Sequence, residues 1–162
     1  MTSRVLLNHL GLTVIDIARS RRFYEELLGF EYWWSFEAPD ELAAKVLMLP
    51  PPVGLVAAYL RRSDIVIELM HFTAAAAREA WRARRLNEPG LTHLSFAVDD
   101  LDAFLARVPE LGGQVLRESR GPRSAWGQSL FIRDPDGQLI EIGTMEWREM
   151  LPGWTPHSPG RI

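Results

Sequence analysis

The sequence predicts an α+β fold made of two tandem βαβββ modules. A phrase beginning with histidine occurs twice, as HLGLTVID at residues 9–16 and as HLSFAVDD at residues 93–100, 84 residues apart. At the same spacing, a helical pattern ends at Gly29 and again at Gly113, and each half closes with an apolar strand that carries one glutamate. Recurrence of strand, helix and closing strand in the same order indicates an internal duplication.

Composition narrows the class of protein. With 162 residues, 47% hydrophobic and 24% charged, the chain resembles an ordinary soluble domain with a substantial core. A net charge of -3 argues against nucleic-acid and anionic-membrane partners, which require clustered positive charge. There is no cysteine, so a metal would be held by nitrogen and oxygen. No stretch approaches the roughly 20 apolar residues of a membrane span, and no signal segment is evident. We therefore expect a cytoplasmic protein.

The first strand of each module has two different faces. Residues 6–14 place His9, Gly11 and Thr13 on one face and leucine and valine on the other, and the strand at His93 repeats this division. Small residues beside each histidine leave open volume in front of the imidazole, as a ligand cavity requires.

A helix is predicted after each first strand. Asp16 and Asp100 are placed to cap the helix N-termini. Both helices carry an apolar stripe, and glycines at 29 and 112–113 end them.

Three strands are expected to follow in each half. In the first half they lie near 30–36, 45–49 and 55–70, the last broken by a turn near 61–63. In the second they lie near 114–118, 128–132 and 138–143, with a turn at residues 134–137, Asp-Pro-Asp-Gly, before the last. The predicted organisation is therefore a first module at 1–72, a linker at 73–92 with a helix over 73–86, a second module at 93–145, and a tail at 146–162 outside the duplication.

Four residues recur at matching points of the two halves and suggest a metal site: His9, Glu68, His93 and Glu141. Both glutamates lie between isoleucines or leucines, where an unpaired carboxylate is costly to bury, and a divalent cation would offset that cost. The alternative is that the glutamates face water on edge strands and that the histidines are hydrogen-bonded core residues. His71 and His157 have no repeat partner and are predicted not to be ligands.

Together, the paired βαβββ pattern, a histidine opening each module, the glutamate on each closing strand and the turn before Glu141 resemble the vicinal oxygen chelate superfamily over residues 5–145. This group is also called the glyoxalase, bleomycin-resistance and dioxygenase superfamily. The resemblance implies curled mixed sheets around a cavity with one divalent metal, which could be Zn, Ni, Co, Mn or Fe, and often a homodimer.

The resemblance also implies an activity. A filled set of two histidines and two glutamates favours the branch of glyoxalase I and methylmalonyl-CoA epimerase, hence a metal-dependent lyase or isomerase that moves a proton next to a chelated carbonyl. Glu141 is the first choice for the base and Glu68 the second. One alternative is an Fe(II) or Mn(II) extradiol-type dioxygenase, in which Glu68 has no role. The other is a non-catalytic protein that binds an antibiotic or a metabolite.

Candidate substrate-binding residues are Trp33, Arg123 and Trp126, which are expected near the rim of the cavity. An arginine there would suit a carboxylate or a phosphate. Because Trp33 and Trp34 point to opposite faces of one strand, one of them is expected in the core.

Overall fold

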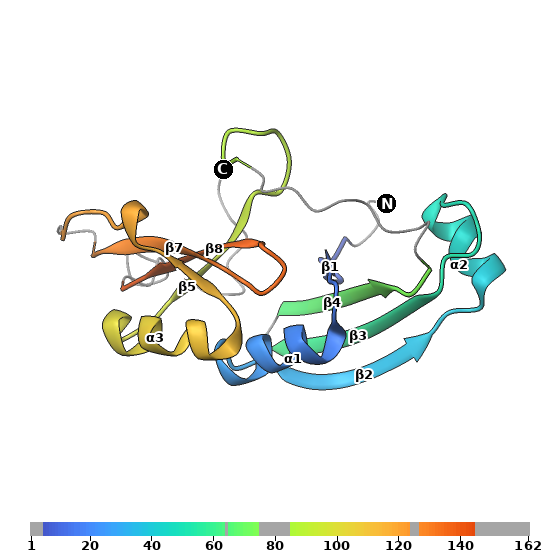
Figure 1. The fold of residues 1–162 in the computed structure, drawn as a ribbon, viewed down its shortest axis with the longest axis horizontal. Helices are drawn as coiled ribbons and strands as arrows, with labels where there is room; N and C mark the ends of the chain where they lie inside the picture. Colours follow the sequence, from blue (N-terminus) through green and yellow to red (C-terminus); the bar gives the residue numbers. More distant parts are fainter. Residues whose placement is uncertain (1–4, 64, 75–84, 124–126, 145–162) are drawn as a thin grey trace. The chain divides into compact units, whose positions relative to one another are not determined.

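The computed structural model describes residues 5–63, 65–74, 85–123 and 127–144 (Figure 1). The chain divides into two compact units, residues 1–83 and 84–162. Each unit contains one of the predicted modules.

The first module contains four strands and two helices: β1 (Leu10–Thr13), α1 (Ile17–Glu26), β2 (Glu31–Glu37), α2 (Asp40–Leu47), β3 (Leu55–Arg62) and β4 (Ile65–Phe72). Its strands form one sheet in the order β1-β4-β3-β2. The β1 and β4 strands are parallel, and the other neighbours are antiparallel.

The second module repeats this topology with β5 (His93–Ala97), α3 (Leu101–Arg107), β6 (Gln114–Leu116), β7 (Ser129–Arg133) and β8 (Leu139–Gly143). Two short 3-10 helices, η2 (Pro109–Leu111) and η3 (Arg117–Ser119), flank β6. The sheet order is β5-β8-β7-β6, with β5 parallel to β8. The predicted pair of βαβββ modules is therefore confirmed.

Helix α1 lies along one face of the first module's sheet, next to β2, β3 and β4 (Figure 1). Phe23 and Tyr24 of α1 are fully buried, as are Ile67 and Leu69 of β4. Side chains alternate across a strand, so Glu68 belongs to the opposite face. The packing of α1 thus orients the glutamate away from the helix.

The predicted helix caps and the turn before Glu141 are confirmed. Asp16 accepts a hydrogen bond from the backbone N–H of Arg19 at 3.0 Å, and Asp100 accepts one from Ala103 at 2.9 Å. In the turn, Asp134 Oδ1 accepts hydrogen bonds from the backbone N–H groups of Asp136 and Gln138. Each cap satisfies an amide that the first helical turn leaves unpaired.

The predicted strand at 45–49 is wrong, because α2 occupies this region. Asp40 begins the helix and accepts hydrogen bonds from the backbone N–H groups of Val53 and Gly54, at 2.7 and 2.9 Å. Ala43 packs against Leu55 and Phe72. Tertiary contacts thus favour a helix where the local apolar run suggested a strand, and the predicted segment 55–70 supplies two strands, β3 and β4.

Most of the predicted linker helix at 73–86 lies outside the described residues, as does the whole predicted tail at 146–162. Both therefore stay predictions. Among the described residues, no helix is long and apolar enough to cross a membrane.

Candidate metal centre

The first module brings His9 and Glu68 together. Glu68 lies on β4, where its neighbour in the parallel pairing is Gly11 of β1. His9 stands two residues before Gly11, so its side chain shares the face of Glu68. The Nε2 atom of His9 is 3.1 Å from Oε2 of Glu68, and Glu68 is only 9% exposed. The two candidate ligands of this module therefore face each other, and the carboxylate of the pair is buried.

Tyr59 holds the second oxygen of that carboxylate. It lies opposite Glu68 in the antiparallel β3–β4 pair, and its hydroxyl donates to Oε1 at 2.7 Å. Burial, followed by the hydrogen bond to Glu68 and the charge of Glu68, raises the pKa of Tyr59 from 10.0 to about 12. Tyr59 is therefore a protonated donor at neutral pH.

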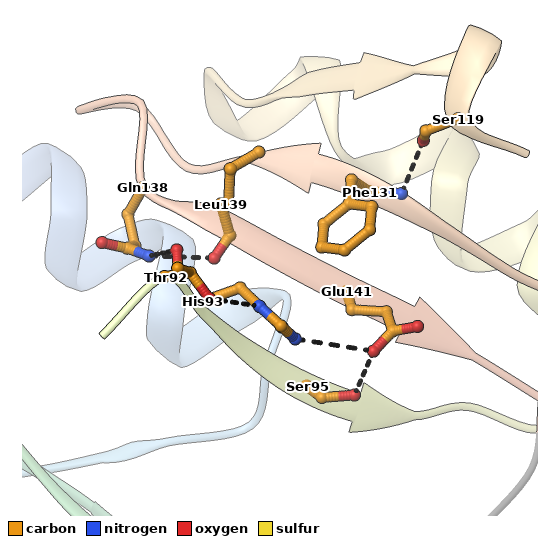
Figure 2. Close-up of polar contacts among 8 residues, drawn as sticks. All are labelled: Thr92, His93, Ser95, Ser119, Phe131, Gln138, Leu139 and Glu141. Atoms are coloured by element: carbon orange, nitrogen blue, oxygen red, sulfur yellow. Dashed lines mark hydrogen bonds and ion pairs between the residues drawn. The ribbon is translucent and has the colours of Figure 1, made fainter. Parts of the chain in front are cut away.

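The second module brings His93 and Glu141 together on β5 and β8 (Figure 2). The Nε2 atom of His93 is 3.8 Å from Oε2 of Glu141, and the hydroxyl of Ser95 donates to the same oxygen at 3.1 Å. On the other side of the ring, Nδ1 of His93 lies 2.8 Å from Oγ1 of Thr92. A partner at Nδ1 orients the imidazole and directs Nε2 toward Glu141.

Gln138 supports the segment that contains Thr92. Its side-chain amide donates to the carbonyl oxygens of Thr92 and Leu139, at 3.1 and 3.0 Å (Figure 2). This amide therefore links the start of β5 to the start of β8, the two strands that carry His93 and Glu141.

The residues present suit a divalent cation. The nitrogen and oxygen of each pair lie near each other, 3.1 Å apart in His9–Glu68 and 3.8 Å apart in His93–Glu141, so both donors of a pair could reach one ion. Imidazole nitrogen and carboxylate oxygen are ligands common to Zn, Ni, Co, Mn and Fe. A cation would also compensate the buried Glu68 carboxylate.

Each module by itself supplies two donors. No group of three or more histidine, aspartate and glutamate side chains that could hold a metal ion occurs within the described parts of the chain. A centre with all four ligands requires both modules, and it stays a prediction.

The candidate substrate-binding residues that the structure describes are exposed. Trp33 is 53% exposed and Trp34 is 43% exposed, so the expectation that one of them lies in the core is wrong. The reason is that β2 is an edge strand with an irregularity at Trp33, where pairing passes from Tyr32 directly to Trp34. Arg123 is exposed, and Trp126 lies outside the described residues. Their role in binding stays a prediction.

The two histidines without a repeat partner lie differently. His71 contacts the carbonyl oxygen of Val14 through Nδ1 at 3.2 Å. It is three residues after Glu68 on β4 and thus on the other face of that strand. His157 lies outside the described residues.

Four residues that contact the pairs or support them were not predicted to belong to the site: Tyr59, Thr92, Ser95 and Gln138. A signal for Tyr59 was present. In each module an aromatic residue is followed by an aliphatic residue and an arginine, and the glutamate comes after the next hairpin turn. The two segments are Tyr59-Leu60-Arg61 before Glu68 and Phe131-Ile132-Arg133 before Glu141.

Comparison with known proteins gives the family. The model of the Glyoxalase/Bleomycin resistance protein/Dioxygenase superfamily matches residues 6–142, and the chain belongs to this superfamily. This confirms the resemblance inferred from the sequence. The chain is similar to a lactoylglutathione lyase of Pseudomonas putida, with 29% identity over 87% of this chain and 86% of the relative.

Two further relatives have other activities. An ethylmalonyl-CoA/methylmalonyl-CoA epimerase of Cereibacter sphaeroides is 24% identical over 84% of this chain and 95% of its own. The metallothiol transferase FosB of Shouchella clausii is 34% identical, but the match covers 44% of this chain and only 50% of FosB. The superfamily therefore does not by itself select one reaction.

Solved structures agree on the fold. A glyoxalase family protein from Bacillus cereus matches with a TM-score of 0.75 at 20% identity, covering 88% of this chain and 95% of that one. A mutant of the fosfomycin resistance protein FosX from Listeria monocytogenes, complexed with Mn(II) and 1S,2S-dihydroxypropylphosphonic acid, matches with a TM-score of 0.60 at 19% identity, covering 93% and 98%.

Proposed function

We propose that this protein is a metal-dependent isomerase or lyase that moves a proton next to the chelated carbonyl of a small oxygenated substrate. The observation that carries the proposal is the recurrence of one His–Glu pair, at the same register of two parallel strands, in both modules. Similarity to a lactoylglutathione lyase and to an acyl-CoA epimerase supports it, because both names describe a lyase or an epimerase rather than an oxygenase.

The four side chains would share one divalent cation: His9, Glu68, His93 and Glu141. The Mn(II) in the FosX complex supports a cation of this kind in the superfamily. When bound, such an ion stabilises the negative charge that develops on two adjacent substrate oxygens as a neighbouring C–H is deprotonated. The histidines and glutamates of this chain would hold the ion and, through it, orient the substrate oxygens.

Glu141 is the preferred base. Its Oε2 accepts from Ser95 and faces His93, whereas its Oε1 receives no hydrogen bond from the described residues. Glu68 is engaged at both oxygens. A general base needs an oxygen that can reach the substrate proton. Glu141 therefore takes the proton, and Glu68 serves as a fixed ligand.

The working assembly that we propose is a homodimer in the cytoplasm, with a small-molecule substrate and no nucleic-acid or membrane partner. Net charge of -3 supports the absence of nucleic acid. Light scattering of the purified protein would test the dimer directly.

The decisive experiment combines metal analysis with proton exchange. Plasma mass spectrometry of the wild type and of His9→Ala, Glu68→Gln, His93→Ala and Glu141→Gln should show about one metal per site, with less in every variant. Metal-loaded wild type should then exchange deuterium from solvent into hemithioacetals of 2-oxoaldehydes or into 2-methyl acyl-CoA thioesters, and Glu141→Gln should not.

Two other outcomes would favour the rival functions. Oxygen consumption with a catechol, unchanged in Glu68→Gln, would favour the dioxygenase. A wild type that takes up no metal even on reconstitution, yet binds a planar antibiotic tightly, would favour a non-catalytic binding protein.

A further inference from the structure

The Glu68 carboxylate is held from two sides. Tyr59 donates to Oε1 at 2.7 Å, and His9 lies 3.1 Å from Oε2. A hydrogen bond to an ionised acceptor is among the stronger ones in proteins, and low solvent exposure strengthens it further. Oε1 is thus committed to Tyr59, and Oε2 alone is directed toward His9.

The ring of Tyr59 is itself held in place. Trp34 lies directly opposite on β2 and stacks on the ring, with centroids 4.8 Å apart and planes 2° from parallel. Phe36 stacks on Trp34 at 5.3 Å. The imidazole of His9 meets Tyr59 edge-on at 5.6 Å. Because a tyrosine hydroxyl lies in line with its ring, a fixed ring aims the hydroxyl at a fixed point.

The described residues of the second module are arranged differently. Phe131 occupies the place of Tyr59, opposite Glu141 on the neighbouring strand, and has no hydroxyl. The donor to Glu141 is Ser95, which takes the place of Gly11 on the parallel strand. A serine hydroxyl turns about a single bond and follows a moving acceptor. The two carboxylates therefore receive hydrogen bonds of different rigidity.

We propose that Tyr59, supported by Trp34, is a positioning residue that locks Glu68 as a permanent ligand and so confines proton transfer to Glu141. The inference rests on the proposed function. With a single mobile carboxylate, the C–H proton leaves one carbon for Glu141 and returns from Glu141 to the adjacent carbon. The hydroxyl proton of the first carbon passes to the carbonyl oxygen of the second, so that one carbonyl is lost and the other is formed with no net oxidation.

The test uses full-length protein reconstituted with Co(II), whose affinity is measured by competition with a chromophoric chelator. Tyr59→Phe keeps the ring and removes the hydroxyl. We expect the Co(II) dissociation constant to rise about 10- to 100-fold, the usual effect of losing a partner of a metal ligand. Tyr32→Phe is the matched control, since it removes a hydroxyl that contacts only Ser35 within the described residues, and it should leave the affinity unchanged.

A rescue variant separates positioning from general damage to the fold. Gly11→Ser in the Tyr59→Phe background places a serine hydroxyl where the second module uses Ser95. A Cβ at Gly11 would lie 3.0 Å from Cε of Met70, the flexible end of a side chain that can shift. We expect this double variant to recover part of the lost affinity, because a serine hydroxyl restores a hydrogen bond to Glu68 but not the fixed direction that the tyrosine ring gives it. Equal Co(II) affinity in Tyr59→Phe and wild type would overturn the proposal.

A measurement on metal-free protein tests the positioning role of Tyr59 separately from the proposed catalytic function. In metal-free protein at constant neutral pH, the ¹³Cδ resonance of Glu68, assigned by its loss in Glu68→Gln, should move in Tyr59→Phe and return toward its original position in the rescue variant. The resonance of Glu141 should not move. Failure of the wild type to bind metal would contradict the proposed function and, with it, the assignment of Glu68 as a ligand. An unmoved Glu68 resonance would contradict the positioning of the carboxylate by Tyr59, whether or not the protein binds metal.

Discussion

Tyr59 and Phe131 occupy the same position in their modules, each opposite the glutamate of the neighbouring strand, but only Tyr59 donates a hydrogen bond to that glutamate. The edge-on contact with the module's histidine is kept in both, at 5.6 Å for Tyr59 and 5.3 Å for Phe131. The duplication therefore preserved an aromatic ring beside each His–Glu pair and left a difference of one oxygen atom.

The hydroxyl of Tyr59 should make the stability of the folded protein depend on pH. The pKa of Tyr59 is raised to about 12, so the folded state holds this proton more tightly than the unfolded state does. The resulting stabilisation is complete below pH about 10, the ordinary value, and is lost as the pH rises toward 12. Difference spectra of tyrosinate between metal-free wild type and Tyr59→Phe should show this late titration.

Glu68→Gln should lower the pKa of Tyr59 without returning it to the ordinary value. The reason is that burial, the largest cause of the shift, remains when the charge is removed. Glu141→Gln serves as the control and should leave the titration of Tyr59 unchanged. A Tyr59 that titrates like an exposed tyrosine in the wild type would contradict the observed hydrogen bond.

Thr92 should affect the metal affinity of the site through its contact with His93. Thr92→Val removes the hydroxyl near Nδ1 while keeping a similar shape, so the ring loses its orienting partner. We expect roughly a tenfold rise in the metal dissociation constant. Thr92→Ser retains the hydroxyl and should bind metal as the wild type does. Identical binding by the valine and serine variants would exclude an orienting role for this hydroxyl.

Asp40 should stabilise the first module by joining α2 to the start of β3. Asp40→Ala leaves the backbone N–H groups of Val53 and Gly54 without their acceptor. We expect the free energy of unfolding in urea to fall by about 1–3 kcal/mol. Glu41→Ala, which removes an exposed acid from the same helical turn, should change it by less than about 0.5 kcal/mol. Similar losses in both variants would assign the effect to helix charge rather than to the two hydrogen bonds.

The matched core positions Ile67 and Ile140 should be equally sensitive to truncation. Both are 0% exposed, and each lies beside a leucine of the parallel first strand. Replacing either by alanine should lower the free energy of unfolding by about 2–5 kcal/mol. Val46→Ala on α2, where the side chain is 66% exposed, should have little effect. A large loss for one isoleucine only would show that the two cores differ in packing.

Much of the architecture follows from local patterns in the amino-acid sequence. The repeated phrase locates both first strands, Asp16 and Asp100 mark both helix starts, and the turn at 134–137 lies ahead of β8 as its residues predict. These features depend on residues within one turn or one strand, so local sequence is sufficient for them. The His–Glu pairs also follow, because parallel pairing of the first and last strands of a module brings them onto one face.

Other features required the tertiary structure. Formation of α2 depends on contacts of Asp40 with Val53 and Gly54 and of Ala43 with Leu55 and Phe72. The exposure of Trp33 and the stacking of Trp34 depend on a one-residue shift in the pairing of β2 with β3. A one-residue change of register moves a side chain to the opposite face, and no local pattern marks where it occurs.

The duplication, the caps and the candidate ligands are thus properties of the amino-acid sequence alone, since they arise from residue type and short spacing. Which hydroxyl reaches each carboxylate is a property of the folded sheets. Tyr59 contacts Glu68 across an antiparallel strand pair, and Ser95 contacts Glu141 across a parallel pair. These partners depend on the register between strands, which the periodicity within a single strand does not determine.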